Sequence, residues 1–156
     1  MSSQLRDFAA SRCIDGVTTV GPQTGDLRNL CHTLVNQDPA PWLLLKFQNT
    51  VEVTRVEIYN RNDSNWQATY ERTRNVEVRL IDELPTRGDT MYTGGQLLGT
   101  FKGPATQGQI ISVNGSAKTG RNVLIQMNHQ DVLHFHEVSV FGRVSSGLSD
   151  ARWTID

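Results

Sequence analysis

The feature that most constrains how this chain can fold is the repeated alternation of short strand-like segments and turns. No ten-residue segment places apolar residues at the three- and four-residue spacing of an amphipathic helix. Turn sequences such as Gly103-Pro104 and Asn114-Gly115 separate short apolar or alternating segments instead. The segments of strand length are residues 42–47, 51–59, 76–80, 97–101, 109–113, 122–127 and 133–141. About seven short strands with frequent turns predict an all-β fold, an antiparallel jelly-roll β-sandwich.

The length and charge of the chain limit what kind of protein it can be. At 156 residues the chain is long enough for one domain with a substantial core. We expect residues 1–142 to form this domain and residues 143–156 to be a C-terminal tail or linker. The formal net charge is −1 and the basic residues are scattered, so no nucleic acid partner is expected. No stretch is long and apolar enough to predict a membrane span.

Two features bear on the cellular compartment without deciding it. Residues 1–7 lack the hydrophobic core of a secretion signal. Such an N-terminus is expected either of a protein that stays inside the cell or of a mature-length chain with an added initiator methionine. Cys13 and Cys31 are the only cysteines, and they fit one disulfide or two free thiols.

Two arginines mark the ends of the loop that joins the strands predicted at residues 51–59 and 76–80. The loop begins at Arg61 and ends at Arg72, so we expect a hairpin whose tip presents two guanidinium groups side by side. His32 lies upstream in another polar loop. Three such donors facing one concavity would suit a ligand rich in acceptor oxygens, such as a sugar with vicinal hydroxyls. The alternative for each arginine is a solvated charge at a strand end.

Several short motifs resemble one family of sugar-binding proteins. Residues 13–16 read Cys-Ile-Asp-Gly, and Trp42 opens an apolar strand. Residues 61–63 read Arg-Asn-Asp, residues 71–72 read Glu-Arg, and residues 136–142 read His-Glu-Val-Ser-Val-Phe-Gly. These motifs resemble those of the F-type lectins, the fucose-binding jelly rolls of the discoidin, or coagulation-factor C-domain, group with its galactose-binding-like fold. The resemblance spans nearly the whole chain.

The resemblance implies a carbohydrate site formed by His32, Arg61 and Arg72, the positions that correspond to the sugar-binding histidine and arginines of the family. Asp63 would orient the arginines, because a carboxylate would otherwise compete with the sugar as an acceptor. The family usually places two adjacent cysteines after its Arg-x-Asp motif, as a platform under the sugar, and this chain has Ser64-Asn65 there. Trp66 and Tyr70 would then supply an aromatic platform for the sugar.

The resemblance also implies a structural calcium ion. The family holds calcium with loop carbonyls, the aspartate of the first motif and the glutamate of the last strand. The corresponding ligands here are Asp15 and Glu137, the carbonyls of Arg12 and Val17, and an oxygen of Asn29. Calcium takes six to eight hard oxygen ligands, which an irregular loop can provide. The alternative is that Asp15 caps a turn and Glu137 is a charge at a strand edge.

Other kinds of function remain to be weighed against a lectin. An enzyme is not expected, because no nucleophile elbow, paired-carboxylate motif or phosphate-binding glycine loop occurs. A zinc site of His129, His134 and His136 would lack a cysteine or carboxylate at ligand spacing. The main rival is a discoidin-like module that docks on a protein or a phospholipid headgroup through Trp66 and Met91-Tyr92. Membrane contact is expected only in that case.

The family resemblance implies fucosylated or galactose-type glycans as partners and an extracellular location. A single site built from neutral hydrogen bonds would bind weakly, with a dissociation constant of roughly micromolar to millimolar. Weak sites become effective when several are linked. An oligomer, or a parent protein with several domains, would therefore be consistent with this function.

Overall fold

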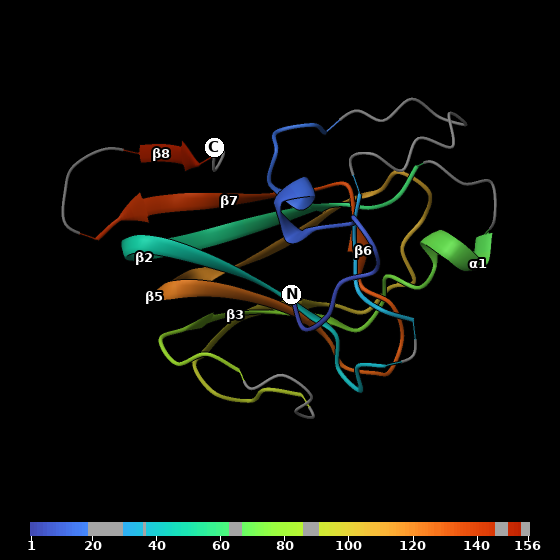
Figure 1. The fold of residues 1–156 in the computed structure, drawn as a ribbon. Coiled ribbons are helices and arrows are strands. Elements are labelled where there is room, and N and C mark those ends of the chain that lie inside the picture. Colours follow the sequence, from blue (N-terminus) through green and yellow to red (C-terminus); the bar gives the residue numbers. More distant parts are fainter. Residues whose placement is uncertain (19–29, 36, 63–66, 86–90, 146–149, 154–156) are drawn as a thin grey trace.

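The computed structural model describes residues 1–18, 30–35, 37–62, 67–85, 91–145 and 150–153 (Figure 1). The only α-helix in these ranges is four residues long, so the predicted all-β class is confirmed. No helix among them has the length and apolar character needed to cross a membrane. In chain order the elements are the 3-10 helix η1 (Ala10–Cys13), β1 (Cys31–His32), β2 (Trp42–Tyr59), α1 (Gln67–Tyr70), β3 (Val76–Ile81), β4 (Gln96–Phe101), β5 (Ile110–Met127), β6 (His134–Phe135), β7 (Glu137–Val144) and β8 (Asp150–Trp153).

Two long strands organise the sandwich. β2 and β5 run antiparallel along each other from the pair Trp42 and Gln126 to the pair Tyr59 and Ile110. β3 pairs with the second half of β5, and β7 pairs with the second half of β2. The resulting six-stranded sheet has the order β4-β3-β5-β2-β7-β8, and β1 pairs with β6 separately. The large sheet curls into two layers, as Figure 1 shows, so the predicted antiparallel β-sandwich is confirmed.

The core lies between these layers and follows the alternation of each strand. Val51 and Val53 are buried in the middle of β2, whereas Val56 and Ile58 are buried near its end. The register irregularity between Val53 and Arg55 causes this change from odd to even positions, because one extra residue turns the following side chains to the other face. β3 keeps one parity, and its inward residues are the predicted Val76, Val78 and Leu80.

Two of the predicted breaks between strands are wrong. The segments 42–47 and 51–59 are one strand, β2, and the two segments predicted between residues 109 and 127 are likewise one strand, β5. Asn114-Gly115, expected to form a turn, lies inside β5. A Cβ atom at Gly115 would clash with the backbone carbonyl of Leu98 on β4. Glycine at this position therefore allows two backbones to approach closely and does not mark a turn.

The predicted hairpin of residues 51–59 and 76–80 is also wrong. β2 and β3 do not pair with each other, because β5 lies between them and pairs with both. The alternation within each strand gives no indication of a partner that comes much later in the chain. Arg61 and Arg72 consequently follow different elements, and their proximity depends on the loops at one end of the sandwich.

The last strands cross the predicted domain boundary. β7 continues to Val144, and β8 pairs with it from Arg143 and Asp150 to Val140 and Trp153. The sheet therefore extends beyond residue 142. The division of the chain into a domain and a tail or linker at that point stays a prediction.

The N-terminal segment is attached to the sandwich by a buried aspartate and by a disulfide. The hydroxyls of Ser2 and Ser3 both donate hydrogen bonds to Asp38, which is 6% exposed. Cys13, at the end of η1, is bonded to Cys31 in β1, and neither cysteine is free. The choice between a disulfide and two thiols is thereby decided for the disulfide.

Candidate functional site

The small β1–β6 sheet places two histidines opposite each other. His32 in β1 is in register with His134 in β6, and their ring centroids lie 5.4 Å apart. The ring of Phe8 lies 6.0 Å from that of His32. His32 Nδ1 donates a hydrogen bond to the carbonyl of Thr33. Because a carbonyl can only accept, this bond fixes the orientation of the His32 ring.

Arg61 reaches the same place from the end of β2. It is 9% exposed, and its Nη1 lies 3.4 Å from Nδ1 of His134. The preceding residue, Asn60, accepts a hydrogen bond from the Thr73 hydroxyl at 2.8 Å and donates one to the Tyr70 carbonyl at 3.0 Å. These two bonds tie the end of β2 to the turn after α1. They therefore hold the loops of Arg61 and Arg72 together without a hairpin.

Arg72 lies in that turn and is oriented by an aspartate from another loop. Its side chain is 39% exposed, and its Nε lies 3.8 Å from Oδ1 of Asp131. Oδ2 of the same carboxylate lies 3.6 Å from Nη2 of Arg74 and 3.6 Å from Nε2 of His129. One carboxylate, 17% exposed, thus lies between two arginines and a histidine. The Asp131 carboxylate limits where the Arg72 guanidinium can point.

The three groups predicted to bind a ligand converge around His134. Burial lowers the pKa of this fully buried histidine well below its usual value, and the positive charges of Arg61, His32 and Arg72 lower it further. The backbone of Thr69 acts in the opposite direction. The rings of His32 and His134 and the guanidinium of Arg61 lie in contact, and Arg72 is near enough for its charge to act on the pKa of His134. The structure therefore brings His32, Arg61 and Arg72 together.

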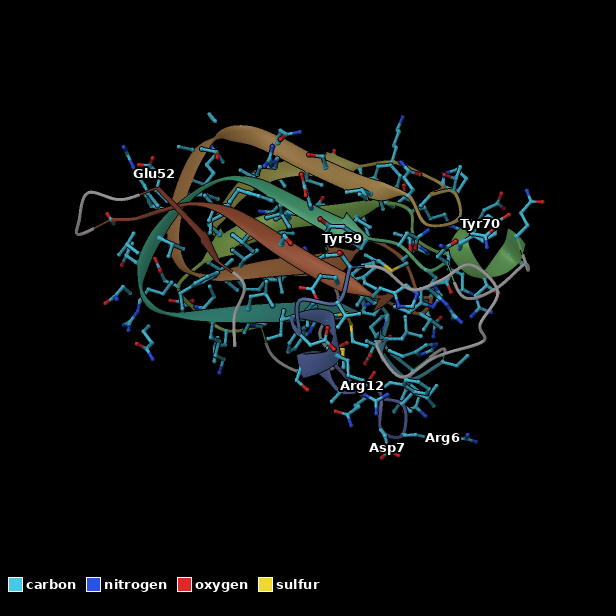
Figure 2. The ribbon with its side chains drawn as sticks, turned by 90° about the horizontal axis from the view of Figure 1, so that it is seen from above. Arg6, Asp7, Arg12, Glu52, Tyr59 and Tyr70 are labelled. Atoms are coloured by element: carbon cyan, nitrogen blue, oxygen red, sulfur yellow. A yellow bond between two sulfur atoms is a disulfide. The ribbon has the colours of Figure 1, made fainter. Side chains whose placement is uncertain are left out.

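Of the remaining residues predicted for this site, the structure describes only Tyr70. Asp63 and Trp66 lie outside the described residues. Tyr70 ends α1 and is half-buried, near one end of the molecule in Figure 2. His134 and Asp131 were not among the predicted sugar-binding residues. The sequence contained a partial signal, because His134 lies in a strand segment, but only the β1–β6 register shows that it faces His32.

The two carboxylates predicted to hold calcium lie next to each other. Glu137 opens β7, is 2% exposed, and its Oε2 accepts a hydrogen bond from the Gly16 N–H at 3.0 Å. Burial raises the pKa of Glu137 to about 7, and the neighbouring Asp15 carboxylate contributes to the increase. Asp15 Oδ1 accepts a hydrogen bond from the Val17 N–H at 3.0 Å, so this aspartate does cap a turn. Two adjacent carboxylates beside an irregular loop are donors that fit a hard cation such as calcium.

The other predicted calcium ligands are less well defined. Arg12 belongs to η1, with its guanidinium 5.6 Å from the centroid of the Phe8 ring, and Asn29 lies outside the described residues. Among the residues that the structure describes, no group of three or more His, Cys, Asp or Glu side chains could hold a metal ion. A site at Asp15 and Glu137 would therefore depend on carbonyl oxygens. The same observation leaves the zinc site of His129, His134 and His136 without support.

The disulfide connects the two regions. Cys13 lies two residues before Asp15, and Cys31 directly precedes His32. The two regions are also linked along the chain, because only two residues separate His134 in β6 from Glu137 in β7. The loop with the paired carboxylates is thus covalently linked to the strand that carries a predicted sugar-binding histidine.

Comparisons with known proteins identify the fold. No family model matches the sequence, and no curated protein matches it. Among solved structures, the fucolectin from striped bass (Morone saxatilis) serum matches with a TM-score of 0.71 and 22% identity over 94% of this chain. The chain spans about half, 47%, of that protein. A fucose binding module of Streptococcus pneumoniae matches with a TM-score of 0.65 and 22% identity, covering 91% of this chain and 88% of that one.

Further structures have the same architecture. The lectin domain of lectinolysin, complexed with Lewis B antigen, matches with a TM-score of 0.66 and 25% identity, over 92% of this chain and 90% of that one. A family 32 carbohydrate-binding module from a Clostridium perfringens glycoside hydrolase matches with a TM-score of 0.61 at 12% identity, over 90% of this chain and 89% of that one. The chain therefore has the F-type lectin and discoidin-like β-sandwich fold that the sequence motifs suggested.

Proposed function

We propose that this protein is a non-catalytic carbohydrate-binding module, a lectin, that holds L-fucose or a galactose-type sugar with His32, Arg61 and Arg72. The observation that carries the proposal is the convergence of these three groups around the neutral ring of His134. Two guanidiniums offer fixed N–H donors that adjacent hydroxyl oxygens can share. The imidazole of His32 adds one more polar group for a sugar hydroxyl.

The structural neighbours support this proposal. The striped bass protein is a fucolectin, the pneumococcal protein is a fucose binding module, and the lectin domain of lectinolysin is complexed with Lewis B antigen. The charged groups at the site are arranged as expected for binding a sugar without catalysis. The carboxylate described beside Arg72 is Asp131, and it is paired with arginines, which suits a residue that positions a donor. Fucosylated or galactose-type glycans are accordingly the proposed partners.

A structural calcium ion is part of the proposal. Asp15 and Glu137 would hold it with carbonyl oxygens of the loop around residues 12–17, and their adjacent carboxylates supply the negative charge that a divalent cation requires. The ion would fix this loop against β7. Through the disulfide, the same loop supports the strand that carries His32. The role of calcium here is to position residues, without contact with the sugar.

Saturation-transfer NMR with L-fucose and with D-galactose tests the sugar-binding proposal. We expect a transfer signal for at least one sugar and a dissociation constant of roughly micromolar to millimolar. Arg72→Ala should weaken binding at least tenfold, because charge-assisted donors to the ligand are lost. Arg143→Ala is the matched control. Arg143 pairs with Glu52 at 2.9 Å, and Glu52 lies at the end of the molecule away from Tyr70 (Figure 2).

The rival function gives a different result in the same samples. A discoidin-like module that docks on phospholipid would float with liposomes and give no sugar signal. At one of its predicted docking loops, the backbone of Tyr92 is held against β5. The Tyr92 N–H and carbonyl exchange two hydrogen bonds with the Gln126 side chain, at 3.1 and 2.6 Å. Flotation in the absence of any sugar signal would contradict the lectin proposal.

A further inference from the structure

We propose that Arg72 and Arg74 extend the sugar site into a second binding position, which takes an acidic substituent, a sulfate or a carboxylate, on the neighbouring residue of the glycan. This inference rests on the proposed sugar-binding function and specifies the class of glycan. Arg72 contributes to both positions, whereas Arg74 acts only on the acidic group.

Arg72 and Arg74 lie on either side of one buried residue, Thr73. Thr73 is fully buried, and its hydroxyl donates a hydrogen bond in the interior. Its N–H donates to the Tyr70 carbonyl at 3.4 Å and its carbonyl accepts from the Ala105 N–H at 2.9 Å, so the backbone at Thr73 is held on both sides. Arg72 and Arg74, on either side of this buried residue, have side chains that are 39% and 47% exposed.

These arginines share a single carboxylate and keep hydrogen-bond donors for a ligand. Arg72 Nε and Arg74 Nη2 lie 3.8 and 3.6 Å from the two oxygens of Asp131. Both distances exceed ordinary hydrogen-bond lengths, so Asp131 orients the guanidiniums without occupying their donors. Burial and the charge of Arg74 lower the pKa of His129, which is therefore neutral near pH 7. Two positive charges and one negative charge leave a net charge of +1 here.

Two other carboxylates near these arginines in the sequence accept hydrogen bonds from other side chains. Glu71 accepts a hydrogen bond from Gln67 at 2.6 Å, within the first residues after α1. Glu77 accepts one from Arg79 at 3.0 Å. Neither acid is among the groups paired with Arg72 or Arg74 in the described part of the chain. Asp131 is thus the carboxylate that these two arginines share in the described part of the chain, and Glu77 is paired with Arg79 instead.

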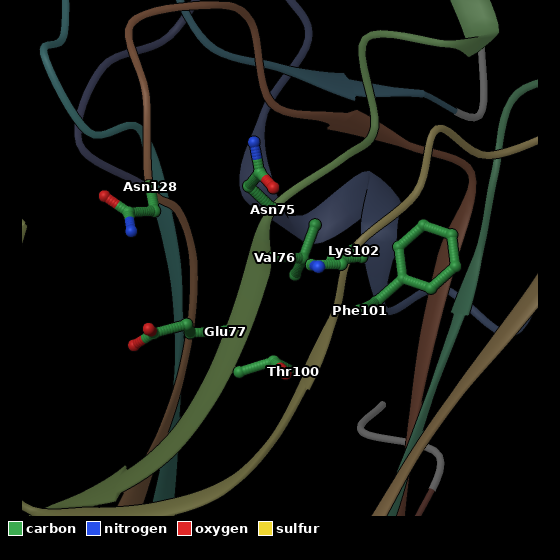
Figure 3. A pocket seen from close by; sticks show the side chains of 7 residues that line it. All are labelled: Asn75, Val76, Glu77, Thr100, Phe101, Lys102 and Asn128. Carbon is green, nitrogen blue, oxygen red and sulfur yellow. The ribbon is translucent and has the colours of Figure 1, made fainter.

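A hollow of about 110 Å³, lined by residues that neighbour the arginine pair in sequence, offers room for part of a second sugar ring (Figure 3). Asn75, which directly follows Arg74, and Asn128, which directly precedes His129, contribute amide groups to its wall. Lys102 and Glu77, which carry opposite charges, also line the hollow. Amide groups suit sugar hydroxyls, whereas the guanidiniums of Arg72 and Arg74 suit an anionic group in the two-pronged geometry that sulfate and carboxylate favour.

The experiment compares three glycans that share one fucosylated core: Lewis a, 3′-sulfo-Lewis a and sialyl-Lewis a. Dissociation constants are measured by NMR titration at low and at high ionic strength. At low ionic strength we expect at least one acidic glycan to bind about fivefold more tightly than Lewis a, and salt to reduce the gain. Arg74→Gln should abolish the gain and leave the affinity for Lewis a unchanged. Arg143→Gln, remote from the site, should preserve it.

The outcomes separate this inference from the function on which it rests. Equal affinity for all three glycans, or a gain that survives Arg74→Gln, would overturn the acidic position and leave the lectin proposal intact. Failure of all three glycans to bind would overturn both. A gain for the sulfated glycan alone, or for the sialylated glycan alone, would support the inference and identify which acidic group the arginines accept.

Discussion

Two neighbouring regions of this protein collect side chains of opposite charge. Around His134, the side chains of His32, Arg61 and Arg72 bring positive charge to a buried neutral ring. Two residues beyond β6, Glu137 is buried against Asp15, so that two acidic groups are adjacent. Burial shifts both pKa values toward the neutral form: it lowers that of His134 and raises that of Glu137. Within the described residues, each region is thus enriched in one sign of charge.

The difference indicates what each region is suited to bind. Like charges held close together cost folding free energy, and a ligand of the opposite character recovers part of that cost. The region of His134 offers donors and positive charge, which suit an oxygen-rich or acidic glycan. The region of Glu137 offers carboxylate oxygens, which suit a cation. The following experiments test this contrast, in order of decreasing effect.

Removing the disulfide should have the largest effect. The Cys13–Cys31 bond closes a loop with a sequence separation of 18, for which the loss of chain-entropy stabilisation is about 3 kcal/mol. We expect the Cys13→Ser/Cys31→Ser variant to lose about this much free energy of unfolding in urea titrations. Reduction of the wild type with dithiothreitol should give the same loss. An unchanged urea midpoint in both cases would show that the bond does not stabilise either region.

Calcium should raise the thermal stability of the protein by binding in the region of Glu137 and Asp15. At a calcium concentration about a hundredfold above the dissociation constant, binding to the native state adds about 2.7 kcal/mol, which raises Tm. We expect Glu137→Gln to lose this calcium-dependent increase, measured by differential scanning fluorimetry with calcium or with EDTA. Glu83→Gln, at an exposed acid, is the control that should keep it. A wild-type Tm that is equal in calcium and EDTA would exclude the proposed ion.

Acid should destabilise the protein through His134. The folded-state pKa of His134 lies below its unfolded value near 6.5, so the unfolded state binds the proton first as pH falls. The stabilisation is complete above pH 6.5 and is lost as pH decreases toward the folded pKa, by about 1.4 kcal/mol per pH unit. Urea titrations from pH 8 to 5 should give a shallower pH dependence for His134→Asn than for the wild type. Equal slopes would mean that His134 titrates normally.

The smallest effect is expected at Asp131. This carboxylate orients Arg72 from a distance of 3.8 Å at a partly exposed position, where such pairs contribute about 0.2–1 kcal/mol. Asp131→Asn should therefore weaken sugar binding about two- to fivefold, much less than Arg72→Ala, in the same NMR titration. Rescue of the affinity by Asp131→Glu would indicate that the charge positions Arg72. A loss as large as that of Arg72→Ala would instead place Asp131 in contact with the sugar.

Several features of this protein followed from the sequence alone. Alternating residues in β3 predicted its inward side chains, because burial on one face of a strand imposes a period of two. The motifs around Asp15, Arg61 and Glu137 pointed to the fold that the structural neighbours share. The same resemblance supplied His32, Arg61 and Arg72 as the proposed sugar-binding groups.

Only the tertiary structure decided how these pieces meet. The insertion of β5 between β2 and β3 ruled out the predicted hairpin, and the β1–β6 register placed His134 opposite His32. The ion pair of Arg72 with Asp131 likewise joins loops that are distant in sequence. The physical reason is that alternation reports on the immediate neighbours of a residue, whereas strand pairing and ion pairing depend on contacts between segments far apart in the chain.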